Sequence, residues 1–158
     1  ESRNGLFLEA IKVKNSLQIL SEVDEDDQIV AIDELQFFDE DIVKVVNELM
    51  QSGKKVIGSG LDLDFKSEPF GQIPQLLAIA TRVDKLSAVC MKCGCDNAAR
   101  TQRLIDGEPA DKNSPTIMIG GDETYEARCV KCYELPDKTK DLKKIKEENT
   151  AKVLSLFK

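Results

Sequence analysis

Residues 29–38 read IVAIDELQFF, four apolar residues that run directly into two adjacent carboxylates. A short apolar run bounded by turn signals is typical of a strand buried on both faces of a parallel sheet. Ligands of open α/β sheets bind beyond the carboxyl ends of the strands, where Asp33 and Glu34 are expected to lie. An acid there can hold Mg²⁺ on a nucleotide's phosphates or take a proton from a nucleophile. A pair of solvated acids at a strand end fits this stretch equally well.

The flanking sequence predicts helices and strands in alternation. Helices are expected where apolar residues recur three or four positions apart behind a capping residue, and strands where short apolar runs end at glycine or proline. The expected elements are a strand over 6–13, a helix that begins at Asn15 or Ser16, a helix over 40–52 capped by Asp39 and ended by Gly53, a strand over 55–59, a helix from Pro74 to Ala80, and a strand over 83–89. A strand, a helix and a second strand in this order predict a parallel crossover and an α/β fold.

Composition limits the classes of function. The chain has 158 residues and a net charge of −7, which allows one medium domain or two small ones and disfavours binding to nucleic-acid backbones. No apolar run approaches the length of a membrane span, and no secretory signal is visible. The sequence contains no histidine, so histidine-based catalysis and metal ligation are excluded. We therefore expect a cytoplasmic protein that binds neither nucleic acid nor membranes.

Five cysteines gather in the second half of the chain. Cys90 with Cys93, and Cys129 with Cys132, form two C-x-x-C pairs separated by a long spacer. Two such pairs can supply the four thiolates of a tetrahedral zinc site, which we favour over a set of buried free thiols. The fifth, Cys95, could replace Cys93 as a ligand, but we expect it to point elsewhere. No acid that could activate water lies within these motifs, so the predicted zinc is structural.

A phosphoryl-transfer enzyme also needs a cradle for phosphates. The P-loop pattern G-x-x-x-x-G-K-[ST] does not occur in the sequence, and residues 58–60, GSG, lack the Lys-Ser/Thr pair that would replace it. Glu34 remains the candidate base for a hydroxyl proton. The aromatic residues that could line a cleft around it, or belong to the core, are Phe37, Phe38, Phe65, Phe70, Tyr125 and Tyr133.

Six motifs in order carry a resemblance to a known family. They are IDELQFF at 32–38, GLDLDF at 60–65, EPFG at 68–71, AVCMKCG at 88–94, IGG at 119–121 and YEARCVKCY at 125–133. Together they closely resemble the zinc-containing (type II) thymidine kinases, over residues 2–136 of this chain.

The resemblance implies a fold and a reaction. The expected fold is a RecA-like, P-loop-type parallel sheet with helices, over residues 1–87, followed by a small zinc-ribbon lasso domain over 88–135. A charged tail over 136–158, with a helical pattern, completes the chain. The implied reaction transfers the γ-phosphate of ATP to the 5′-hydroxyl of thymidine with Mg²⁺. It gives dTMP for nucleotide salvage and DNA synthesis, and deoxyuridine is expected to be accepted as well.

The resemblance also implies roles for individual residues. Asp33 resembles the Mg²⁺-associated acid, Glu34 the catalytic base, and the paired cysteines the zinc ligands, namely Cys90, Cys93, Cys129 and Cys132. Residues that resemble the nucleoside pocket and its lasso are Phe37, Leu61, Phe65, Phe70, Thr101, Thr116, Ile117, Met118, Ile119 and Tyr125. Backbone groups of the lasso segment are expected to hydrogen-bond the thymine edge.

The resemblance also bears on the partners of the protein, and alternatives to the kinase interpretation remain. The resemblance implies a homotetramer that is inhibited by dTTP. The family's P-loop lies upstream of the matched stretch, so we expect either further sequence before Glu1 or a remnant of the enzyme. A non-catalytic zinc-ribbon interaction module on an α/β scaffold is the alternative. A nucleic-acid-binding zinc ribbon is disfavoured by the acidic charge.

Overall fold

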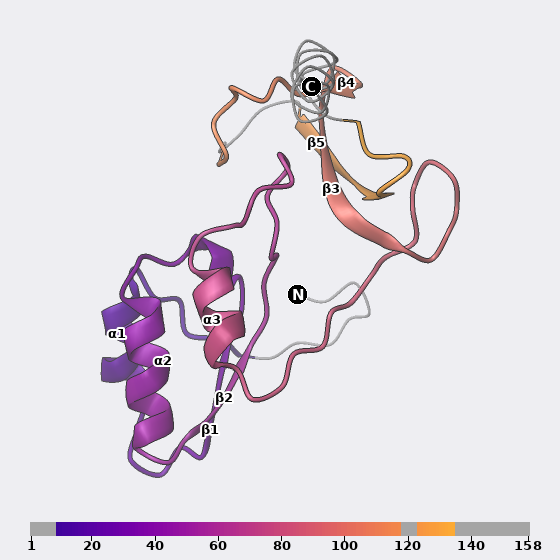
Figure 1. Ribbon diagram of the computed structural model, residues 1–158. Helices are drawn as coiled ribbons and strands as arrows, with labels where there is room; N and C mark the ends of the chain where they lie inside the picture. The colour runs from indigo at the N-terminus through magenta and orange to yellow at the C-terminus, as the bar shows by residue number, and fades with distance from the viewer. Residues whose placement is uncertain (1–8, 118–122, 135–158) are drawn as a thin grey trace, which may run out of the picture. The chain divides into compact units, whose positions relative to one another are not determined.

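The computed structural model describes residues 9–117 and 123–134, which divide into two compact units (Figure 1). The first unit holds the chain up to Asp64 together with Pro69–Asp84, and the second holds Phe65–Glu68 together with the chain from Lys85 onward. Residues 6–8 of the strand expected over 6–13, and the tail expected over 136–158, lie outside the described residues, and residues 9–13 form no strand. No helix in the described part of the chain is both long and apolar enough to cross a membrane.

The first unit is a mixed α/β structure whose strands are parallel. Its elements are α1 (Ser16–Glu22), β1 (Ile29–Ile32), the 3₁₀-helix η1 (Leu35–Phe37), α2 (Ile42–Gln51), β2 (Lys55–Gly58) and α3 (Ile73–Ile79). Strand β1 pairs with β2 in a register that sets Ile29 opposite Lys55 and Ile32 opposite Gly58. Because α2 connects two parallel neighbours, the predicted strand–helix–strand crossover is confirmed.

Local signals explain where the helices begin and end. The Asn15 side chain caps α1 by accepting a hydrogen bond from the Gln18 N–H at 3.0 Å, as predicted. Gly53, in the left-handed conformation with φ 84°, follows α2 as expected. The predicted cap of α2 is wrong, since the helix begins at Ile42 with Asp41 as its N-cap. Asp39 instead accepts hydrogen bonds from the backbone N–H groups of Ser16 and Asp41, so it links α1 to the start of α2.

The core of the first unit lies between α1, α2, α3 and one face of the strands. Ile42, Val45 and Leu49 of α2 are almost completely buried, and Ile32 of β1 is buried with them. On the other face, Ile29 is 57% exposed and Ile57 is 50% exposed. The expectation that the strands are buried on both faces is therefore wrong for the described residues, because their helices cover one face only.

The second unit is an antiparallel sheet in the order β4-β3-β5. Its strands are β3 (Ala98–Ile105), β4 (Glu108–Pro109) and β5 (Glu123–Cys129). The strand expected over 83–89 does not form, and the segment makes only an isolated bridge between Ala88 and Ala98. Its apolar side chains find no cover in the described structure: Leu86 is 91% exposed and Val89 is 62% exposed.

A truncation in α2 tests this core. Leu49→Ala removes a side chain that is 2% exposed, and should lower the free energy of unfolding by about 2–5 kcal/mol, because lost burial and a residual cavity add. Met50→Ala, on the adjacent exposed position, should cost about 0.5 kcal/mol. Urea unfolding followed by circular dichroism measures both, and similar losses would contradict the assignment of α2's buried face.

Candidate functional site

The carboxyl ends of β1 and β2 bring a carboxylate and a hydroxyl together. Asp33 follows β1 and Ser59 follows β2, and the Ser59 hydroxyl donates to Asp33 Oδ1 at 2.5 Å. The Ser59 N–H donates to the Ile32 carbonyl at 3.0 Å, so the parallel ladder continues to this point. The predicted position of Asp33 at the end of a parallel strand is thus confirmed, and its partner Ser59 was not anticipated.

Glu34 occupies an unusual backbone conformation beside Asp33. Its φ is 55°, in the left-handed region that residues other than glycine rarely adopt. Its N–H donates to Asp33 Oδ1 at 2.9 Å, and its carboxylate accepts a hydrogen bond from the Gln36 side-chain amide. The two adjacent acids therefore have different side-chain partners, which allows them different roles. Backbone strain of this kind is concentrated at functional sites.

The buried side chain of Gln36 connects the segments that follow β1 and β2. Gln36 is only 3% exposed, and its Oε1 accepts a hydrogen bond from the Leu61 N–H at 3.0 Å. The chain packs so closely around it that a Cβ at Gly60 would lie 2.7 Å from Gln36 Oε1, and one at Gly71 would lie 2.5 Å from the Gln36 carbonyl oxygen. Sequence analysis missed Gln36 because a glutamine in a polar–apolar stretch carries no signal of burial.

Aromatic and apolar residues flank Glu34 in the first unit. The rings of Phe37 and Phe70 meet edge to face with centroids 5.5 Å apart. Phe37 is 54% exposed and Leu61 is 47% exposed, so both are available to a ligand. An open cavity of about 400 Å³ lies here, lined by residues 13–15, Glu34 and residues 37–39.

The second unit gathers another set of predicted residues around a buried arginine. Arg103 on β3 is fully buried, and its guanidinium lies over the rings of Phe65, at 5.0 Å, and Tyr125, at 5.9 Å. Its Nη1 donates to the Pro115 carbonyl at 2.8 Å, which connects the strand to the segment before Thr116. Arg103 was also missed by sequence analysis, since an arginine in a strand is ordinarily expected at the surface.

The remaining predicted residues of the lasso lie in different settings. Thr101 is half-buried on β3, opposite Ala127 of β5. Thr116 is half-buried and Ile117 is 52% exposed, whereas Met118 and Ile119 lie outside the described residues.

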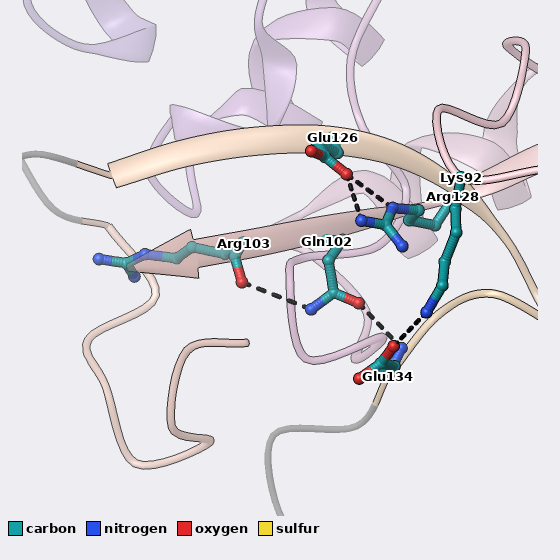
Figure 2. A network of polar contacts seen from close by, with 6 residues as sticks. All are labelled: Lys92, Gln102, Arg103, Glu126, Arg128 and Glu134. Carbon is teal, nitrogen blue, oxygen red and sulfur yellow. Dashed lines mark hydrogen bonds and ion pairs between the residues drawn. The ribbon is translucent and has the colours of Figure 1, made fainter. Parts of the chain in front are cut away.

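A polar network connects β3 to the two cysteine pairs (Figure 2). The buried Gln102 accepts a hydrogen bond from the Glu134 N–H at 2.8 Å, and the Glu134 carboxylate pairs with the Lys92 ammonium at 2.5 Å. Lys92 lies between the first pair of cysteines and Glu134 follows the second pair. The Arg128 guanidinium pairs with Glu126 on β5, while that of Arg103 points away from the network (Figure 2). The network therefore holds the two cysteine pairs against one strand.

Cysteine sulfurs form a cluster that fits a tetrahedral metal. The Sγ atoms of Cys90, Cys93, Cys95 and Cys129 all lie within 4.8 Å of one another. The Sγ atoms of Cys93 and Cys129 are 3.8 Å apart, and four thiolates bound to zinc at about 2.3 Å would be separated by about 3.8 Å. The donor set and its spacing fit a structural zinc ion.

Thiolates that lie close together repel one another, and the pKa values of the thiols shift in opposite directions within the cluster. Hydrogen bonds from the backbone, led by that of Cys129, lower the pKa of Cys90 to about 6. Contact with Cys93, together with burial, raises the pKa of Cys132 to about 12. Although the Asn97 backbone stabilises its thiolate, contact with Cys93 and burial raise the pKa of Cys95 to about 11. A divalent metal would remove this conflict by stabilising every thiolate that it binds.

The expectation that Cys95 points away from the cluster is wrong. Gly94, with φ 74°, turns the chain, and the Cys90 N–H donates to the Cys95 carbonyl at 2.7 Å. This turn brings Cys95 back beside Cys90. Cys132 is not among the four mutually close sulfurs, but it packs against the buried cluster of Cys90, Ala98 and Cys129.

Fold and site together define a class: an α/β unit with acids at the ends of parallel strands, accompanied by a small β unit with a thiol cluster suited to zinc. A family model described as "Thymidine kinase" matches residues 1–133. This chain belongs to the thymidine kinase family, and the cysteine cluster supports its zinc-containing type.

Metal analysis tests the cluster. Purified protein should contain about one zinc per chain, and Cys90→Ser or Cys129→Ser should lower that content, because each removes a buried thiolate. Loss of the metal should also lower the thermal stability of the second unit, since binding free energy contributes to folding. Met91→Ser, at an exposed position of the same motif, is the matched control and should retain zinc. Wild-type protein with well under one zinc per chain would contradict the assignment.

Proposed function

We propose that this protein is a thymidine kinase that transfers the γ-phosphate of ATP to the 5′-hydroxyl of thymidine, giving dTMP for nucleotide salvage. We propose that deoxyuridine is accepted too. Membership of the family supports a kinase, and the observation that carries the proposal is the Glu34 carboxylate, held by Gln36 beside the Asp33–Ser59 pair. The RecA-like, P-loop-type architecture belongs to the same proposal, with the parallel pair β1–β2 as its supporting feature.

Glu34 is assigned the general base. A base must lie within hydrogen-bond reach of the proton that it abstracts, and positioned carboxylates serve this purpose. The hydrogen bond from Gln36 orients the carboxylate, and the remaining oxygen lone pairs can accept the proton of the 5′-hydroxyl as its oxygen attacks phosphorus. Gln36 is a positioning residue in this scheme, because it acts through Glu34.

Asp33 is assigned to the magnesium ion that accompanies ATP. Its carboxylate and the Ser59 hydroxyl are oxygen donors in contact, the ligand type that Mg²⁺ prefers. When bound, Mg²⁺ would neutralise charge on the phosphates. The family's P-loop motif, which would cradle those phosphates, does not occur in the printed sequence.

The nucleoside is assigned to the aromatic and lasso residues. In the first unit these are Phe37, Leu61 and Phe70, and in the second they are Phe65, Thr101, Tyr125 and residues 116–119, whose backbone would hydrogen-bond thymine. Support comes from the exposure of Phe37, Leu61 and Tyr125 and from the fixed position of the Tyr125 ring against Arg103. The zinc site, by stabilising the second unit, would support the lasso. A homotetramer, inhibition by dTTP and a cytoplasmic location are parts of the same proposal.

Steady-state kinetics of the complete gene product test the base. Glu34→Gln keeps the size of the side chain and one oxygen that can accept from Gln36, but it cannot take up a proton, so kcat should fall roughly 10²- to 10⁴-fold. Thymidine binding measured by calorimetry should change little, because a base acts mainly in the transition state. Glu48→Gln on the surface of α2 is the control and should have wild-type kinetics. A Glu34→Gln enzyme with near-wild-type kcat would overturn the assignment, and a wild-type protein without thymidine phosphorylation would instead support the non-catalytic alternative.

A substitution at Arg103 tests the nucleoside assignment separately. Arg103→Met keeps the length but removes the guanidinium that contacts Phe65, Tyr125 and Pro115. The KM for thymidine should rise about tenfold or more, consistent with the loss of a buried charged hydrogen bond, with a smaller change in kcat. Arg100→Met, three residues earlier on the same strand, is the control and should affect neither constant. A fall in kcat at unchanged KM would argue against this positioning role.

A further inference from the structure

The thiol cluster contains more sulfur than a zinc ion can bind. Structural zinc is four-coordinate, whereas five cysteines of this chain converge on one position. Four of their sulfurs lie within 4.8 Å of one another, and the fifth cysteine, Cys132, packs against the buried cluster of Cys90, Ala98 and Cys129. One thiol must therefore stay off the metal whenever zinc is bound.

Three of the cysteines have settings that favour permanent ligation. Cys90 and Cys129 are 1% and 6% exposed and lie in the apolar core of the second unit with Ala98. The Cys93 sulfur is 3.8 Å from that of Cys129, the separation expected for two thiolates on one zinc ion. These three form a common base for the site.

Cys95 and Cys132 compete for the remaining position. Both are half-buried and pack against the core formed by Cys90, Ala98 and Cys129. The Cys95 sulfur lies within 4.8 Å of those of Cys90, Cys93 and Cys129, and Cys132 belongs to the same C-x-x-C pair as Cys129. The Cys95 carbonyl accepts a hydrogen bond from the Cys90 N–H at 2.7 Å. The Cys132 N–H donates to the Cys129 carbonyl at 3.0 Å.

We propose that Cys95 and Cys132 are interchangeable fourth ligands of one zinc ion whose other ligands are Cys90, Cys93 and Cys129. In the exchange, the bond from zinc to one sulfur forms as the bond to the other breaks. The proton of the incoming thiol passes to the outgoing thiolate, so charge and oxidation state are unchanged. The proposal rests on the thiol cluster and not on the kinase reaction, and its test has no kinase readout.

Metal binding by serine variants of the full chain tests the exchange. Cobalt replaces zinc in the purified protein, and the intensity of its sulfur charge-transfer bands reports the number of thiolates bound. Competition with a chromophoric chelator gives zinc affinity. Cys95→Ser and Cys132→Ser should each keep the four-thiolate spectrum and near-wild-type affinity. The double variant should lose one thiolate and bind zinc more weakly. The loss of affinity should exceed roughly 100-fold, because removing only the hydrogen-bond partner of a ligand already costs roughly 10- to 100-fold.

Two further variants serve as controls for the exchange of Cys95 and Cys132, and two results would overturn it. Cys90→Ser, which removes a common ligand, should by itself resemble the double variant, and Met91→Ser should resemble wild type. If Cys132→Ser loses a thiolate while Cys95→Ser does not, Cys95 is a bystander and the proposal fails. The reverse pattern makes Cys95 the sole fourth ligand and also overturns exchange.

Alkylation of zinc-loaded wild-type protein gives a measurement that does not depend on the folding of a variant. Limiting N-ethylmaleimide should label about one thiol per chain, and peptide mass spectrometry should find that label divided between Cys95 and Cys132. Label confined to one of the two, or present mainly on Cys90, Cys93 or Cys129, would refute interchangeable ligation.

Discussion

Parallel pairing of β1 with β2 is the constraint on which the first unit depends. The register that sets Ile32 opposite Gly58 also brings the next residues, Asp33 and Ser59, into hydrogen-bond contact. An offset of one residue would exchange the strand faces and separate this pair. The pairing requires a crossover, and α2 supplies both the connection and more of the buried core than any other element of the unit. The position of the acids is therefore a consequence of the same packing that stabilises the unit.

Gln36 fixes the positions of the residues at the carboxyl ends of β1 and β2. Its buried amide connects Glu34 to the Leu61 backbone, so the loops that follow β1 and β2 share one hydrogen-bond partner. A buried side-chain amide is costly unless its polar atoms are paired, and here both ends have partners. The same pairing holds Glu34 in its left-handed conformation, a strained state that persists only when its surroundings determine it.

The second unit relies on polar and sulfur contacts where the first relies on apolar burial. Its apolar cluster is small, with Cys90, Ala98 and Cys129 as the buried members. A core of this size supplies little stability, and small domains commonly add a metal. Arg103 completes the other end of the sheet, where its buried charge is stabilised by two aromatic rings and by the Pro115 carbonyl. The cysteine cluster and the arginine thus lie toward opposite ends of β3.

The sequence alone determined the order of the three helices and two strands of the first unit, the parallel crossover, the strand-end position of Asp33, the clustering of cysteines and the family. Each of these depends on local periodicity, on capping residues or on motif spacing, which can be identified from the order of residues alone. Tertiary structure decided what depends on partners distant in sequence: the exposed faces of β1 and β2, the failure of residues 83–89 to form a strand, and the contacts of Gln36, Ser59 and Arg103. Cys95 shows the difference most directly. Its place among the sulfurs follows from a left-handed turn at Gly94 and a hydrogen bond to Cys90, neither of which the spacing of the cysteines could specify.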